Sequence, residues 1–139
     1  HPLVEPQNVV LIGRRDEHEP YSHEGLRQLR IPDVPYPDVR ARGHGAVAEE
    51  ALTRLTRPEL AGFWIHVDAD VLDEEVMPAV DSPTPEGPNI EELVELVAPL
   101  ARHPKALGLE LTIYDPVLDP DRACAERLVA LLEGITRGL

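Results

Sequence analysis

The feature that most constrains the fold is an apolar strand that runs directly into two carboxylates. The apolar run is Phe63–Val67, and Asp68 and Asp70 follow it with a single residue between them. Because successive side chains in a strand point to opposite faces, Asp68 and Asp70 should point to the same side of the strand's end. Two carboxylates directed at one point repel each other, which favours a cation between them. Oxygen-rich sites of this kind, with some imidazole, suit manganese or magnesium.

Further apolar runs alternate with amphipathic segments along the chain. We expect strands near Val9–Gly13, Val34–Pro37, Phe63–Asp68 and Ala106–Tyr114. Strands that alternate with helices indicate a mainly parallel sheet with helices on both faces, which is a three-layer αβα architecture. The sequence therefore predicts an α/β fold of about four strands, with residues 1–139 forming a single domain.

Helices are expected between these strands, where apolar residues repeat at helical spacing. They fall at Ser22–Arg30, at Gly43–Arg57, after Asn89 and at Asp119–Leu132. Asn89 and Glu92 form a capping-box pattern at the start of the third of these helices. The prolines within 31–39 instead permit only a short extended segment at the edge of the sheet.

Composition narrows the classes of partner. The formal net charge of −13 argues against nucleic acid or an anionic membrane, and it is compatible with a small cationic substrate or with metal ions. Cys124 is the one cysteine, so an intramolecular disulfide is excluded. No apolar run approaches the ~20 residues that a membrane span needs, and no signal peptide is visible. We therefore expect a cytoplasmic protein.

A long loop follows the two carboxylates. Residues 70–88 are rich in acidic residues and prolines, and loops of this length tend to carry function. In open α/β sheets, ligands bind at the carboxyl ends of the strands, which is where this loop begins. Asp70 and Asp73 could instead merely cap a turn, as single aspartates after strands often do. A carboxylate pair in register, followed by a stiff loop, favours the metal site over that alternative.

Several stretches resemble the ureohydrolases, the family of arginases, agmatinases and formimidoylglutamases. His66–Asp73 and Met77–Gly87 resemble the family signature, which is an Asp-x-Asp at a strand end, a third Asp and a Pro-containing loop that leads to a helix start. Val9–Asp16 resembles the family's strand that ends in Gly-x-Arg, and Gly108–Asp119 resembles its last strand. The likeness covers nearly the whole chain.

The resemblance implies a manganese-dependent hydrolase that cleaves a guanidino or formimidoyl C–N bond. It makes Asp68 and Asp70 ligands of a centre of two Mn²⁺ ions, where a shared water loses a proton at neutral pH and attacks the substrate carbon. Asp70 would also be the catalytic residue that relays the proton. Glu110 matches an acidic position of the family, which implies a role in substrate binding.

Three departures from the family pattern limit this expectation. The Gly-Gly-Asp-His and Asp-Ala-His-x-Asp motifs, which supply the other metal ligands, are absent from this sequence. Ile113 stands where the family usually carries a glutamate that binds the guanidinium. Glu74 and Glu86 stand where the family carries proline and glycine. The chain thus resembles the carboxy-terminal half of an arginase-like fold. We expect it to be inactive alone, and to self-associate or to need the amino-terminal half.

Two alternatives belong to other functional classes. A non-catalytic arginase-like fragment or interaction domain is favoured by the missing ligands and by Ile113. A magnesium-dependent phosphatase-like domain would share the acidic strand ends, but it should show a phosphate-cradling loop, and the sequence has none. His66 alternates onto the same face as Asp68, and we interpret it as a buried, hydrogen-bonded histidine.

Overall fold

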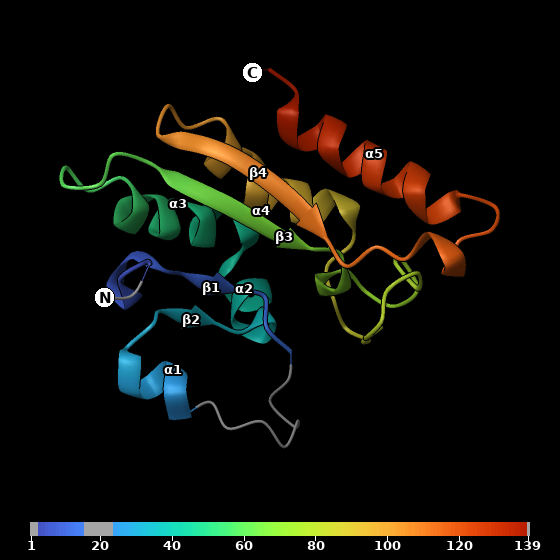
Figure 1. Ribbon diagram of the computed structural model, residues 1–139, viewed down its shortest axis with the longest axis horizontal. Helices are drawn as coiled ribbons and strands as arrows, with labels where there is room; N and C mark the ends of the chain where they lie inside the picture. Colours follow the sequence, from blue (N-terminus) through green and yellow to red (C-terminus); the bar gives the residue numbers. More distant parts are fainter. Residues whose placement is uncertain (1–2, 16–23, 139) are drawn as a thin grey trace.

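The computed structural model describes residues 3–15 and 24–138 of the chain, in which strands and helices alternate (Figure 1). The strands are β1 (Leu11–Ile12), β2 (Asp33–Val34), β3 (Phe63–Asp68) and β4 (Ala106–Thr112). The helices are α1 (Glu24–Leu29), α2 (Tyr36–Arg42), α3 (His44–Leu55), α4 (Ile90–Ala101) and α5 (Ala123–Thr136). Short 3₁₀ turns are η1 (Pro6–Asn8), η2 (Ala69–Val71) and η3 (Pro116–Leu118).

The strands pair in parallel, as the alternation of strands and helices predicted. β1 pairs with β2, with Leu11 opposite Asp33, and β3 pairs with β4, with Asp68 opposite Thr112. Within the described residues these are two separate ladders, and Figure 1 shows the β1–β2 ladder on the side of β3 away from β4. The α/β class with four parallel strands is confirmed. The expected single sheet is divided, because no strand of the described ranges pairs with the second edge of β3 or of β1.

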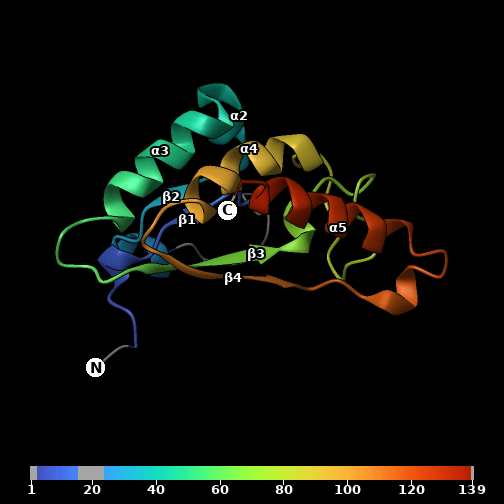
Figure 2. The same cartoon turned by 90° about the horizontal axis from the view of Figure 1, so that it is seen from above.

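The two faces of the β3–β4 ladder have opposite environments. Phe63, Ile65 and Val67 are at most 8% exposed, whereas Trp64 is 58% exposed and Leu107 on β4 is 67% exposed. Figure 2 shows α3, α4 and α5 together on one side of the ladder. We call the face with Trp64 and Leu107 the open face. Because strands alternate with helices along the chain, we expected helices on both faces of the sheet. In the described part of the chain, α3, α4 and α5 instead cover one face of this ladder.

One helix departs from the sequence-based expectation. The segment Val34–Pro37 was expected to be extended, but the strand ends at Val34 and α2 begins at Tyr36. Pro37 lies in the first turn of α2, where the missing N–H costs no hydrogen bond and the fixed φ favours the helix. The prolines here start a helix, so the strand prediction is wrong after Val34.

The other helices lie close to their predicted places. Asn89 caps α4 as expected: its side-chain oxygen accepts from the N–H of Glu92 at 2.9 Å, and Glu92 Oε2 accepts from the N–H of Asn89 at 2.9 Å. The last helix begins at Ala123, four residues later than the predicted start at Asp119. None of the helices in the described part of the chain is long and apolar enough to cross a lipid bilayer.

The long loop after β3 is part of the hydrophobic core. Met77 and Ala79 are fully buried, and Val80 is 2% exposed. The carbonyl of Ala79 accepts from the N–H of Asp115 at 2.9 Å, and the carbonyl of Val76 accepts from Arg127 Nη1 on α5 at 2.7 Å. The loop is therefore held in one conformation by packing and by hydrogen bonds to the segment after β4 and to α5.

Candidate metal site

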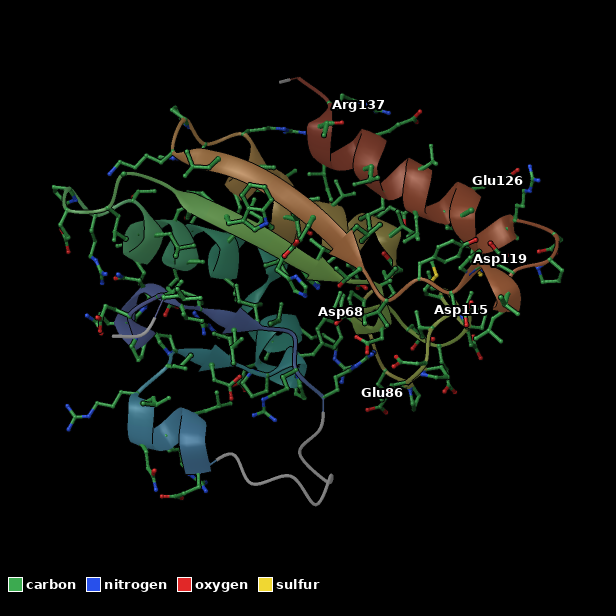
Figure 3. All side chains as sticks on the ribbon, viewed as in Figure 1. Asp68, Glu86, Asp115, Asp119, Glu126 and Arg137 are labelled. Atoms are coloured by element: carbon green, nitrogen blue, oxygen red, sulfur yellow. The ribbon has the colours of Figure 1, made fainter. Side chains whose placement is uncertain are left out.

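The two predicted metal ligands lie where β3 passes into the loop. Asp68 is the last residue of β3 and is labelled at this junction in Figure 3, and Asp70 lies in the turn η2. The side-chain oxygen of Asp68 accepts from the N–H of Asp70 at an N···O distance of 3.4 Å. The turn therefore keeps the two aspartates in contact. We expected both to point to one side because side chains alternate along a strand, but Asp70 has already left the strand, so the contact depends on the turn.

Asp70 shows the effect of this crowding. Burial, followed by repulsion from Asp68 and a hydrogen bond to its carboxyl group, raises the pKa of Asp70 to about 6. Asp81, farther along the loop, adds repulsion, and Arg15 opposes it. A bound cation would offset this repulsion and favour the charged form of the carboxyl group.

The donor set fits part of a manganese site. Carboxylate oxygens are ligands that Mn²⁺ accepts, and Asp68 and Asp70 present them together. Among residues 3–15 and 24–138, no group of three or more His, Cys, Asp or Glu side chains is placed to hold one ion. The pair could therefore contribute ligands, and an ion held there would need further ligands besides these two carboxylates. Their role as ligands stays a prediction.

Asp73, the third aspartate of the motif, has a structural position. Its Oδ1 accepts from the N–H of Glu75 at 2.9 Å, and its Oδ2 accepts from the N–H of Gly87 at 3.1 Å. Its own N–H donates to the carbonyl of Pro88 at 3.1 Å. Asp73 thus ties the start of the loop to its end, so the turn-capping alternative holds for this residue.

Glu110, the predicted substrate-binding residue, lies on β4 opposite His66. Glu110 Oε1 is 2.8 Å from His66 Nδ1, and Thr112 Oγ1 is 3.4 Å from His66 Nε2. The hydrogen bonding of His66 is confirmed, but its side chain is 55% exposed, so the prediction of burial is wrong. Asp68, two residues after His66, shares this open face. The substrate role of Glu110 stays a prediction, and its pairing with His66 joins two distant strands that sequence spacing could not connect.

Ile113 adopts an unusual backbone conformation directly after β4. Its φ is +70°, in the left-handed region that a β-branched residue seldom occupies, and its side chain is 42% exposed. The preceding residue, Thr112, lies opposite Asp68. Strain of this kind persists only where the surrounding structure imposes it, and it clusters at functional sites.

The sequence prediction missed the importance of Asp119, which is 5% exposed and lies ahead of α5 (Figure 3). Its carboxylate accepts from the Tyr114 hydroxyl at 2.9 Å and from the N–H groups of Cys124 and Ala125 at 3.0 and 2.8 Å. Burial alone would raise the pKa of Asp119, but the hydrogen bonds from Cys124 and Ala125 outweigh it, and the pKa is lowered. The available signal was an aspartate at the very start of the predicted helix Asp119–Leu132.

Comparison with known proteins gives consistent matches over the whole chain. The sequence model of the arginase family matches residues 1–135. Formimidoylglutamase from Bacillus subtilis (strain 168) is 28% identical over 138 aligned residues, which cover 96% of this chain and 43% of that protein. Arginase from Brevibacillus brevis is 25% identical over 134 residues, covering 96% of this chain and 44% of that protein.

The solved structures agree with these sequence matches. The structure of arginase from Bacillus caldovelox aligns with a TM-score of 0.86 at 28% identity, and the alignment covers 100% of this chain and 46% of that one. The chain therefore spans less than half the length of the relatives that it matches.

Proposed function

This chain belongs to the arginase family, and on that premise we propose that it is the carboxy-terminal portion of a manganese-dependent hydrolase. The proposed reaction is cleavage of a guanidino or formimidoyl C–N bond in a small cationic substrate. The observation that carries the proposal is the contact between Asp68 and Asp70, together with the raised pKa of Asp70. A carboxylate pair at the carboxyl end of a strand, whose mutual repulsion Arg15 offsets only in part, is suited to a cation.

Each residue has a proposed role. Two Mn²⁺ ions, when bound, supply a hydroxide at neutral pH. Asp68 and Asp70 contribute oxygen ligands, and Asp70 relays a proton through its carboxyl group. Glu110 contacts the cationic substrate from β4. Because the relatives are about twice as long as this chain, we propose that the remaining ligands come from the other part of an arginase-like fold.

We propose this other part of the fold as the partner of the open face. Trp64 and Leu107 expose apolar surface there, and β3 and β1 each have an edge that pairs with no strand of the described ranges. Apolar surface and free strand edges of this kind attract partner chains. Self-association is the competing outcome, and it would use the same surface.

The single tryptophan gives a direct measurement of that contact. The chain is mixed with a separately produced amino-terminal half of Bacillus subtilis formimidoylglutamase, and Trp64 emission is recorded with the emission of that half alone subtracted. We expect a blue shift at an equimolar ratio, because docking removes the indole from water. A blue shift that depends only on the concentration of this chain would indicate self-association, and emission unchanged under both conditions would contradict the partner proposal.

Metal binding and turnover test the proposed reaction. We expect this chain alone to bind Mn²⁺ weakly or not at all, because two carboxylates leave most of an octahedral shell unfilled. We also expect no urea release from arginine or agmatine. With the amino-terminal half added, Mn²⁺ should bind, and the C–N bond of a guanidino or formimidoyl substrate should be cleaved.

The variants Asp68→Ala and Asp70→Ala should abolish the Mn²⁺ binding and the C–N cleavage that appear when the amino-terminal half is added. Glu75→Gln, which changes an exposed carboxylate of the same loop, should leave both intact. Tight binding of two ions by the chain alone that survives Asp68→Ala would contradict the proposed site. Turnover by the 139-residue chain as a monomer would contradict the proposed incompleteness.

A non-catalytic arginase-like fragment or interaction domain is the second candidate. The observation in its favour is that the described residues place no three metal-binding side chains around one point. This candidate predicts that the partner still docks on the open face but that the assembly neither binds Mn²⁺ nor cleaves any of the substrates. The two measurements above therefore separate the candidates.

A further inference from the structure

Arg15, three residues after the end of β1, reaches across to the backbone that follows β3. Its Nη2 donates to the carbonyl of Asp70 at 2.6 Å and to the carbonyl of Leu72 at 3.2 Å. One guanidinium nitrogen thus binds a carbonyl in the middle of the turn η2, that of Asp70, and a carbonyl directly after the turn, that of Leu72. The contact links the two ladders of the fold at the point where the carboxylate pair emerges.

The same guanidinium also packs against the far end of the loop. Its Nη1 is buried and has no hydrogen-bond partner within residues 3–15 and 24–138. A Cβ atom at Gly87 would lie 1.8 Å from Nη1 and 2.5 Å from the backbone nitrogen of Asp73. The position therefore requires glycine because Arg15 and the turn occupy the space of a side chain. Gly87 also donates to Asp73, so the guanidinium lies against the place where the start and the return of the loop are joined.

The positive charge of Arg15 is partly buried, and neighbouring polar groups compensate it. Burial lowers the pKa of Arg15, and the neighbouring carboxylates of Asp70 and Asp73 oppose that effect. Arginine nevertheless stays protonated in proteins, so a cation is retained in a partly desolvated place. A buried cation is costly unless it is hydrogen-bonded and neutralised, and here two carbonyls and two nearby carboxylates provide for it.

We propose that Arg15 is a positioning residue for the carboxylate pair. It fixes the backbone of residues 70–72 and the return of the loop at Gly87, so that Asp68 and Asp70 lie together before any ligand binds. Preorganisation of this kind is what a ligand site needs from the residues behind it. The identity of the ligand rests on the proposed function, but the constraint on the loop does not.

Arg14 provides a matched control. It is the adjacent arginine with the same charge, and it is engaged elsewhere: its Nη2 donates to Asp33 Oδ2 at 2.6 Å and its Nε to Asp33 Oδ1 at 3.3 Å. Arg14 thus acts within the β1–β2 ladder. A change at Arg14 removes the same charge without touching the turn after β3.

Hydrogen–deuterium exchange of the 139-residue chain tests the constraint without any metal or substrate. We expect Arg15→Met to raise amide exchange in residues 70–76 by roughly tenfold or more, while exchange in α4 and α5 stays as in the wild type. Gly87→Ala should reproduce this pattern, Arg15→Lys should give part of it, and Arg14→Met should not. Exchange that is unchanged in 70–76, or that rises equally throughout the chain, would overturn the proposal. Should Arg15→Met fail to fold, Arg15→Lys carries the same comparison.

A second readout uses the chain assembled with the amino-terminal half, and Mn²⁺ alone as the probe. Electron paramagnetic resonance of Mn²⁺ should show an affinity about tenfold weaker for Arg15→Met, and unchanged for Arg14→Met. Measurable Mn²⁺ binding that is equally tight in the wild-type assembly and in the Arg15→Met assembly would overturn the positioning role. If the wild-type assembly binds no Mn²⁺, the proposed function fails, and the exchange pattern alone decides whether Arg15 holds the turn.

Discussion

Asp70 and Asp119 are both aspartates in segments that follow a strand, Asp70 partly buried and Asp119 buried, yet their surroundings are opposite. Asp119 receives three hydrogen bonds, from the Tyr114 hydroxyl and from the first N–H groups of α5. Asp70 faces another carboxylate, Asp68. The fold therefore lowers the pKa of Asp119 and raises the pKa of Asp70 to about 6. A carboxylate that the fold satisfies stabilises the protein, and one that it leaves unsatisfied stays available for a ligand.

The difference comes from the segment that each aspartate precedes. Asp119 precedes a long helix, whose first N–H groups have no partner within the helix and point at its carboxylate. Asp70 lies in a turn of three residues, η2, and the loop after it returns past Asp73 instead of forming a helix at once. Asp119 thus has a structural role, whereas the negative charge of Asp70 is disfavoured by its surroundings.

The largest effect should come from Asp119→Ala. The change leaves two backbone donors and the Tyr114 hydroxyl without their acceptor in a buried place, so we expect the Tm to fall by roughly 10 °C. Differential scanning calorimetry measures this, with Asp121→Ala as the control. Among the described residues, Asp121 accepts only from the N–H of Ala123 at 3.2 Å, and it is exposed, so its loss should cost far less stability. Equal losses in the two variants would remove the contrast between a satisfied and an unsatisfied aspartate.

Asp70→Asn should stabilise the protein, in contrast to Asp119→Ala, and by a smaller amount. The variant removes a charge that the fold disfavours, so the free energy of unfolding at pH 7.5 should rise by about 1 kcal/mol, after allowance for screening of a half-exposed group. Urea denaturation measures the change, with Asp81→Asn as a comparison because Asp81 is exposed and contributes less to the crowding. A destabilised Asp70→Asn would show that the pair is compensated within this chain.

The pH dependence should separate the two aspartates further. The folded pKa of Asp70 lies above its ordinary value of 3.8, so its contribution to stability is present at low pH and is lost as the pH rises through about 6. The folded pKa of Asp119 is lowered, so its contribution is present above its ordinary range and is lost as the pH falls through the folded pKa. We therefore expect Asp70→Asn to remove the loss of stability as the pH rises through about 6, and Asp119→Asn to remove the loss of stability at acidic pH. Urea denaturation from pH 3 to 7.5 measures both. Identical profiles for both variants would contradict the assignment.

The smallest expected effect concerns Ile113, in the segment that leads from β4 to Asp119. Ile113→Asn should raise the free energy of unfolding by about 0.5–1 kcal/mol, because asparagine tolerates a positive φ and isoleucine does not. Ile113→Val keeps the β-branching and should bring no gain. Urea denaturation of both variants measures the difference, and a loss of stability in Ile113→Asn would mean that the half-exposed side chain contributes more through packing than it costs in strain.

Local patterns in the sequence predicted the features that depend on neighbouring residues. The contact of Asp68 with Asp70 follows from their spacing, and the start of α4 follows from Asn89 and Glu92. The apolar run Phe63–Val67 could not reveal that one face of β3 is open, because Trp64 is apolar and yet 58% exposed.

Contacts between distant parts of the chain lay beyond sequence reasoning. His66 meets Glu110 only because β3 and β4 are neighbours, and Arg15 meets the turn after β3 only because the two ladders come together there. The two backbone donors to Asp119 lie five and six residues farther on, inside the predicted helix, so the sequence did not reveal them. The start of α2 was missed because Pro37 fits both an edge strand and a first helical turn.

The packing of Met77, Ala79 and Val80 has a consequence for proteolysis. A long, acidic, proline-containing surface loop is ordinarily where proteases nick a folded domain. In this chain the middle of that loop is buried and is tied by its carbonyls to Asp115 and Arg127. Cleavage between Met77 and Val80 requires that the core open first, so this part of the loop should survive digestion for as long as the fold itself.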